Sequence, residues 1–166
     1  MKFKITLQVN RQYGDLLPFN YQYEQSAVIY RILAQADTKY SLWLHENGYD
    51  VNGCKRFKLF CYSPFIFEKV KPLPEAGCLN IIGERAVLYI SFIPEKSTFE
   101  FIKGLFDHQS FTIGNKEHRV AFDIVGVEAI PMPQLSEEMV FQTLSPICVK
   151  LHEGNKTQYL SPDNPM

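Results

Sequence analysis

Apolar and polar residues alternate in two stretches of the chain, one at its start and one near its middle. From Phe3 to Val9 every second side chain is apolar, and the residues between them are lysine, threonine and glutamine. The same alternation recurs from about Ala86 to Ile93. Because successive side chains of a strand point to opposite faces of a sheet, each stretch predicts a strand with one buried face.

Between these strands, one segment carries apolar residues at helical spacing. A helix from Gln22 to Ala36, at about 100° per residue, would carry two adjoining apolar stripes. The first contains Tyr23, Ala27, Tyr30 and Ala34, and the second contains Ile29, Leu33 and Ala36. A tyrosine on such a stripe is read either as a core residue whose hydroxyl is hydrogen-bonded or as a functional group. The pattern leaves both readings of Tyr30 open.

A shorter helix is predicted from Lys39 to Asn47. Its apolar face leaves His45 to one side, in the last turn, where the negative end of the helix dipole favours a protonated imidazole. His45 is therefore either a surface histidine that caps the helix or a residue with a chemical role.

The next segment, from Phe57 to Ser63, alternates in the manner of a strand. One face would carry Phe57, Leu59 and Cys61, and the other Lys58, Phe60 and Tyr62. Lys55 and Arg56 come directly before it. Cations beside aromatic rings suit single-stranded nucleic acid, because cations contact phosphates and rings stack on bases. The alternative is a strand face that is half core and half rim.

Further along, Ser97 and Glu100 form a capping box that predicts a helix ending at about Asp107, with an apolar face of Phe99, Ile102 and Leu105 or Phe106. Two strands follow, at about residues 111–113 and 117–127. The order β-α-β-β-α-β predicts an α+β fold of the ferredoxin-like kind, with an antiparallel sheet of the type seen in RAMP and RRM domains. We assign this domain to residues 1–128.

The remainder of the chain has a different character. Residues 129–138 contain Pro131 and Pro133 and predict a linker. A strand is predicted from Met139 to Leu151, followed by a polar tail. We interpret residues 139–166 as the truncated start of a second domain, of which this would be the first strand.

Composition narrows the functional classes. The 166 residues are 46% hydrophobic with a formal net charge of −1, so any nucleic-acid site has to be a local basic patch. The four cysteines show no metal-binding spacing, and neither the histidines nor the carboxylates suggest a metal or a cofactor. Reduced thiols, an N-terminus without a signal peptide and the lack of a long apolar run predict a cytoplasmic protein with no membrane segment.

Several short motifs carry a resemblance to a known family. They are N-x-Q-Y, I-Y around Tyr30, L-H-E-x-G around His45, F-K-L-F-x-Y-S around Lys58, and T-L-S-P-I within residues 141–149. Together they resemble the CRISPR-associated endoribonucleases of the Cas-six family, in the RAMP superfamily. The resemblance places the family's catalytic tyrosine, histidine and lysine on Tyr30, His45 and Lys58. Lys55 competes with Lys58 for the role of the lysine.

The resemblance implies a metal-independent endoribonuclease that cuts CRISPR precursor transcripts within the repeat, as part of antiviral defence. In such enzymes the 2′-hydroxyl attacks the adjacent phosphorus and leaves a 2′,3′-cyclic phosphate. The RNA would be contacted by Lys55, Arg56, Phe60 and Tyr62. The implied partners are CRISPR repeat RNA and other Cas proteins of an interference complex. An unpaired strand of the second domain would favour pairing of two copies into a homodimer.

Two other classes of function compete with this reading. The first is a RAMP subunit that binds repeat RNA without cutting it, since the superfamily contains both kinds. The second is an interaction module on a ferredoxin-like fold that has nothing to do with RNA.

Overall fold

The computed structural model describes residues 1–51, 55–134, 136–140, 149–153 and 156–160. By the contacts within the chain these residues form two compact units, Met1–Met132 and Pro133–Met166. Each unit is described separately below.

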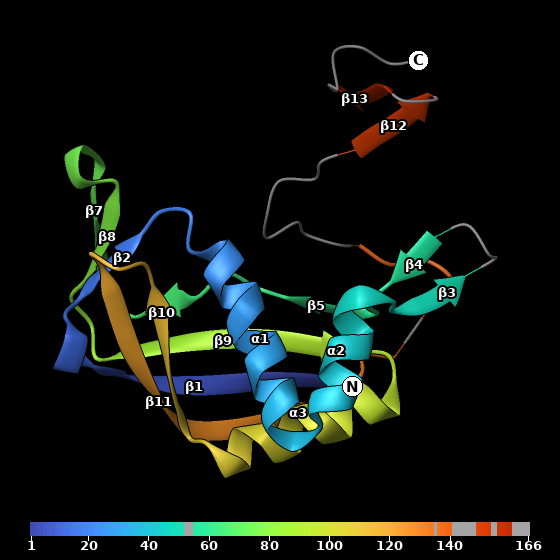
Figure 1. Cartoon of the computed structure of the whole chain (residues 1–166), viewed down its shortest axis with the longest axis horizontal. Coiled ribbons are helices and arrows are strands. Elements are labelled where there is room, and N and C mark those ends of the chain that lie inside the picture. The colour runs from blue at the N-terminus through green and yellow to red at the C-terminus, as the bar shows by residue number, and fades with distance from the viewer. Residues whose placement is uncertain (52–54, 135, 141–148, 154–155, 161–166) are drawn as a thin grey trace. The chain divides into compact units, whose positions relative to one another are not determined.

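The first unit is built on one antiparallel sheet of six strands (Figure 1). Along it the order is β10-β11-β1-β9-β5, and β6 pairs with another part of β9. The six strands are β1 (Lys2–Asn10), β5 (Phe60–Tyr62), β6 (Ile66–Phe67), β9 (Arg85–Phe92), β10 (Ser110–Gly114) and β11 (Arg119–Ile130). The central strand β1 alternates as its sequence predicts, with Phe3, Ile5, Leu7 and Val9 buried.

Three helices pack on one face of this sheet (Figure 1). They are α1 (Gln22–Ala36), α2 (Thr38–Glu46) and α3 (Glu95–Asp107). Helix α1 links β1 to β5, and α3 links β9 to β10 and β11, so the chain follows the order of a ferredoxin-like fold. The predicted fold class and the bounds of the first helix are confirmed.

Smaller elements complete the two units. A second sheet contains β2 (Leu16–Pro18), β8 (Cys78–Ile81) and β7 (Val70–Leu73), and a hairpin after α2 contains β3 (Tyr49–Val51) and β4 (Lys55–Phe57). Two short 3₁₀ helices span Arg11–Tyr13 and Pro74–Ala76. The second unit contains β12 (Val149–Glu153) paired with β13 (Lys156–Leu160).

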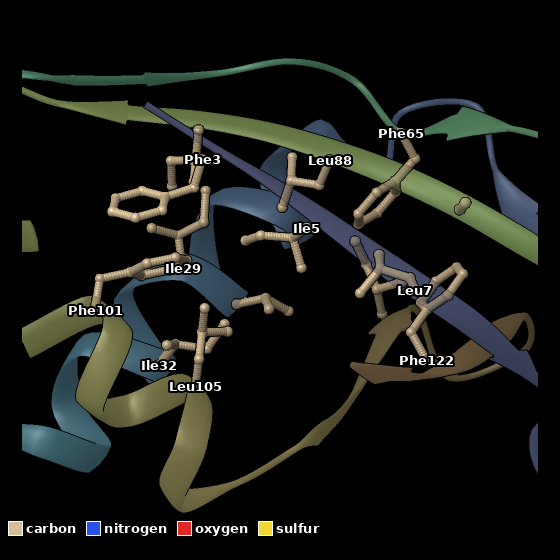
Figure 2. Close-up of a cluster of buried hydrophobic side chains, with 14 of the residues drawn as sticks. Phe3, Ile5, Leu7, Ile29, Ile32, Phe65, Leu88, Phe101, Leu105 and Phe122 are labelled. Carbon is tan, nitrogen blue, oxygen red and sulfur yellow. The ribbon is translucent and has the colours of Figure 1, made fainter. Parts of the chain in front are cut away.

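The core of the first unit lies between the sheet and the helices. Figure 2 shows side chains of β1 and β9 facing those of α1 and α3. Ile29 and Ile32 come from α1, and Phe101 and Leu105 come from α3. Burial of this apolar surface, at roughly 25 cal/mol per Å², is what fixes the helices on the sheet.

The buried faces of two helices differ from the predicted ones. On α1 the buried residues are Gln25, Val28, Ile29, Ile32 and Leu33, while Tyr23 is 82% exposed. Of the two predicted stripes, the one through Ile29 and Leu33 lies on the buried face and the one through Tyr23 does not, because the β-branched and leucine residues of α1 pack on the sheet.

On α3 the capping box is wrong. The helix begins two residues earlier, at Glu95, and Ser97 is fully buried inside it rather than at its cap. The buried face carries Phe101 and Leu105, whereas Phe99 and Phe106 are exposed. The sequence of α3 offers four phenylalanine or leucine residues, at positions 99, 101, 105 and 106. Which of them are buried is decided only by how α3 packs against α1.

The predicted strand Phe57–Ser63 is two strands. β4 ends at Phe57, β5 begins at Phe60, and between them Leu59 has a left-handed φ of 55°. This break reverses the expectation for Cys61, which is exposed instead of facing the core. A φ in this region is uncommon for a non-glycine residue and is not visible in an alternating pattern.

In the second unit, residues 141–148 lie outside the described part, so the predicted strand Met139–Leu151 is seen only at its end, in β12. The predicted polar tail contains a further strand, β13. β12 pairs with β13, so the strand predicted to be unpaired has a partner along one edge. Within the residues described here, none of the helices has the length and apolarity that a membrane span requires.

The close approach of α3 to α1 depends on Gly104. A Cβ built on this residue would lie 1.9 Å from the carbonyl oxygen of Ile32. Glycine-to-alanine changes inside helices normally stabilise by about 1 kcal/mol. We expect Gly104→Ala to lower the free energy of unfolding in urea instead, by about 1 to 3 kcal/mol, because the helices have to move apart.

Gly126→Ala in β11 is the matched control. There a Cβ would lie 3.6 Å from the Cβ of Thr6, which is an ordinary contact. A Gly104→Ala protein as stable as the parent or more stable would show that α1 and α3 are not packed this closely.

Candidate active site

The three residues singled out as catalytic in the sequence come together. Tyr30 is on α1, His45 is in the last turn of α2, and Lys58 follows the β3–β4 hairpin. The rings of Tyr30 and His45 meet edge to face, with centroids 4.9 Å apart and an interplanar angle of 80°. His45 is exposed and Tyr30 is half-buried, so both rings can be reached from solvent.

Lys58 is held at the C-terminal end of α2. Its Nζ donates to the backbone carbonyl oxygen of Leu44 at 2.6 Å and also to that of His45. The last carbonyl groups of a helix have no partner within the helix, and a cation there also meets the negative end of the helix dipole. Lys58 is therefore connected to the backbone of the histidine beside which it would act.

A glycine makes this approach feasible. Gly48 lies two residues after the end of α2 and has a left-handed φ of 69°. A Cβ at this position would lie 2.8 Å from the carbonyl oxygen of Phe57 and 3.3 Å from the Cδ of Lys58. The lysine chain thus passes over the turn only because Gly48 has no side chain there.

Two hydrogen bonds fix α2 relative to α1. The Asp37 carboxylate caps α2 by accepting from the backbone N–H of Tyr40 at 2.9 Å. The hydroxyl of Ser41 donates to the carbonyl oxygen of Tyr30 at 2.8 Å and is 5% exposed. Ser41 thereby sets the spacing between Tyr30 and His45. Nothing in the sequence singles out Ser41, because a lone serine in a helix carries no signal of such a role.

Burial shifts the pKa values of two of these three side chains, Tyr30 and Lys58. Loss of hydration raises the pKa of the Tyr30 hydroxyl, with a smaller contribution from Tyr62. Loss of hydration also lowers the pKa of the Lys58 ammonium, followed by the charge of Arg56. At neutral pH the Tyr30 hydroxyl is therefore protonated and able to donate a hydrogen bond.

Tyr30 packs against the core, but its hydroxyl is placed differently from that of a fully buried tyrosine. In the part of the chain that the structure describes, this hydroxyl has no hydrogen-bond partner, unlike that of the buried Tyr21, which accepts from the backbone N–H of Phe65. The ring of Tyr30 packs on the core while its polar end stays available. That arrangement leaves a donor beside His45.

The predicted RNA-contacting residues have different positions. Phe60 lies beside Tyr30 with centroids 5.8 Å apart, and Tyr62 stacks on Phe60 at 6.2 Å. Phe60 also contacts the buried Phe92 at 5.6 Å, so it belongs partly to the core. Arg56 is exposed. The backbone of Lys55 lies in β4, and its side chain lies outside the described part, which leaves its competition with Lys58 undecided.

A groove of about 450 Å³ adjoins this site. Its lining joins the end of β4, the break at Leu59, β5 and the end of β9, and it includes Arg56, Lys58, Phe60 and Cys61. In the described residues, no three histidine, cysteine or carboxylate side chains lie close enough together to hold a metal ion.

Comparison with known proteins gives one family. The family model for the N-terminal part of CRISPR-associated protein Cas6 matches residues 16–122. The chain is 27% identical over 165 residues to the CRISPR-associated endoribonuclease Cas6 1 of Methanocaldococcus jannaschii, covering 97% of the chain and 59% of that protein. It is 30% identical over 149 residues to the Cas6nc protein of Pyrococcus horikoshii, covering 88% and 56%.

Solved structures agree with this. A RAMP protein described as binding different RNA substrates superposes with a TM-score of 0.73 at 28% identity, over 99% of this chain and 64% of that one. The product of a Cas6-related gene from Pyrococcus furiosus superposes with a TM-score of 0.75 at 25% identity, over 99% and 63%. The chain thus spans less than two thirds of the length of the proteins it matches.

The position of Lys58 predicts a structural effect beside any chemical one. We expect Lys58→Met to lower the free energy of unfolding by about 1 to 2 kcal/mol, because two carbonyl groups at the end of α2 lose a charged donor. Urea denaturation measures this effect.

Lys103→Met, on the exposed side of α3, is the control and should unfold like the parent. Equal stability of the Lys58 and Lys103 variants would mean that the ammonium group does not hold the end of α2.

Proposed function

Because the chain belongs to the Cas6 family of CRISPR-associated proteins, we propose that it acts in an endoribonuclease that cuts CRISPR precursor transcripts within the repeat. The observation that carries this proposal is the grouping of Tyr30, His45 and Lys58 at one end of α2. The relatives named as endoribonucleases support the class of reaction.

The chemistry assigned to the site is an internal transfer at phosphorus. The 2′-oxygen of the ribose on the 5′ side of the cut loses its proton and attacks the adjacent phosphorus. The bond to the 5′-oxygen of the next nucleotide breaks, and that oxygen takes up a proton. The products are a 2′,3′-cyclic phosphate and a free 5′-hydroxyl, and the reaction needs a base, an acid and a stabiliser of the phosphorane charge.

The three side chains can supply these functions without a metal. His45 moves protons, because an imidazole both accepts and donates them near neutral pH. Tyr30 donates a hydrogen bond to an oxygen of the reacting phosphate, since its raised pKa keeps the hydroxyl protonated. Lys58 places a positive charge beside the same phosphate, because two of its three N–H donors bind carbonyl groups and one remains.

A second candidate, binding of repeat RNA without cleavage, has one observation in its favour. The ammonium of Lys58 already bonds to Leu44 and His45, so part of its charge serves the helix rather than a substrate. In this case Tyr30, Phe60 and Tyr62 would be a surface on which bases stack.

We also propose a domain arrangement, with residues 1–128 as the ferredoxin-like domain, 129–138 as a linker and 139–166 as the start of a second domain. The boundary between the compact units near Met132 and the partial coverage of the relatives support it. The experiment below therefore uses the chain alone and the chain joined to the C-terminal part of its Methanocaldococcus jannaschii relative.

The decisive measurement is cleavage of end-labelled repeat RNA in the presence of EDTA. We expect cleavage by the joined form to survive the chelator and to stop when the 2′-hydroxyl at the cut site is replaced by hydrogen. His45→Ala should slow the reaction by about 100-fold or more, since general acid–base catalysis contributes factors of this size.

His108→Ala, an exposed histidine after α3, is the matched control and should cut like the parent. RNA that is bound but not cut by the joined form would favour the binding subunit. Cleavage that requires a divalent metal, or that persists without the 2′-hydroxyl, would contradict the proposed mechanism.

A further inference from the structure

A second cavity lies on another side of α2. It has a volume of about 480 Å³, and its lining comes from the start of α2, the start of β3 and the start of α3: Asp37, Lys39, Tyr40, Trp43, Tyr49 and Lys96. Trp43 and His45 are two residues apart on a helix, which is about 200° around its axis. The cavity is therefore separate from the site at Tyr30 and His45.

Three aromatic rings form its wall. Tyr40 and Trp43 are stacked with centroids 5.8 Å apart, and Trp43 meets Tyr49 edge to face at 5.1 Å. The hydroxyl of Tyr40 is hydrogen-bonded to those of Ser97 and Tyr49, which fixes two of the rings. Trp43 is 39% exposed, so part of a large apolar ring is presented to solvent on a rigid support.

The rim of the cavity is positively charged. Lys96 lies 4.7 Å from the centre of the Tyr40 ring and 3.6 Å from the Asp37 carboxylate. Lys39 is exposed and, within the described ranges, forms no ion pair. The charge of Glu100 also acts on the Tyr40 hydroxyl. The lining itself carries two lysines and one carboxylate beside the aromatic rings, which favours a planar group attached to an anion over a cation.

We propose that this cavity binds one unpaired nucleotide of RNA, with its base on the Trp43 ring and its phosphate at Lys39 and Lys96. The inference rests on the proposed function, because it assigns a second contact to the same RNA. Aromatic rings accept any base through their π-faces, and lysines contact the backbone without reading sequence. The bound nucleotide lies away from the one that is cut, so the cavity affects RNA affinity rather than the rate of the chemical step.

Trp43 is the single tryptophan of the chain, and its fluorescence therefore reports on this cavity alone. Titration of the chain with a short single-stranded oligoadenylate should quench the emission and saturate. The double variant Lys39→Gln and Lys96→Gln keeps Trp43 and its fluorescence. It should bind oligoadenylate about fivefold or more weakly, because both lysine contacts to the phosphate are lost. Trp43→Leu removes the tryptophan emission, so its binding is followed with the same oligoadenylate carrying a fluorescent end label. It should weaken binding by about tenfold relative to the parent, in line with loss of one base stack.

Two further titrations test the contributions of the base and of the phosphate separately. Inorganic phosphate alone should not quench, and adenosine alone should quench weakly. Quenching by phosphate to the same extent as by oligoadenylate would overturn the proposal, since it would indicate an anion site. Unchanged Trp43 emission at saturating oligoadenylate would overturn it as well.

His45→Ala separates this inference from the proposed function. The variant should bind oligoadenylate with the parental quench even though cleavage is lost. If the lysine pair and Trp43→Leu leave RNA binding unchanged while the joined form still cuts repeat RNA, the cavity proposal fails and the proposed function stands. If the joined form cuts nothing but the quench and its lysine dependence are seen, the cavity binds nucleotides and the cleavage proposal fails.

Discussion

The hydrogen bonds that hold α2 by its backbone are the interaction on which the rest of the functional surface depends. Asp37 caps its start, Ser41 ties its middle to the carbonyl of Tyr30, and Lys58 occupies the carbonyl groups at its end. A helix of nine residues is too short to be stable by itself. Its position is set by these contacts and by the burial of Tyr40 and Leu44.

Because α2 is fixed in this way, it can present different groups on its two sides. One side brings His45 against Tyr30, near the groove along β5. The other side presents Trp43 between Tyr40 and Tyr49. A single element thus carries both the proposed chemistry and the proposed second RNA contact, on opposite sides of its axis.

The sheet and the α1–α3 contact supply the rigidity behind this arrangement. The buried alternate residues of β1 and the close approach at Gly104 fix α1, and α1 in turn carries Tyr30. Tyr30 is partly buried by this packing, and the loss of hydration is the main cause of its raised pKa. The core therefore moves the pKa of Tyr30 further above neutral and widens the pH range over which its hydroxyl stays protonated.

The sequence by itself determined the ferredoxin-like order and the bounds of α1, and its resemblance to the Cas6 family singled out Tyr30, His45 and Lys58 as the candidate site. Alternation and helical spacing are local properties, and the motifs around Tyr30, His45 and Lys58 are contiguous, so both can be read along the chain. Only the tertiary structure decided which face of α1 and α3 is buried, where the strand breaks at Leu59, and that Ser41 and Gly48 position the site. These features depend on contacts between residues distant in the chain, and a pattern of side chains does not contain them.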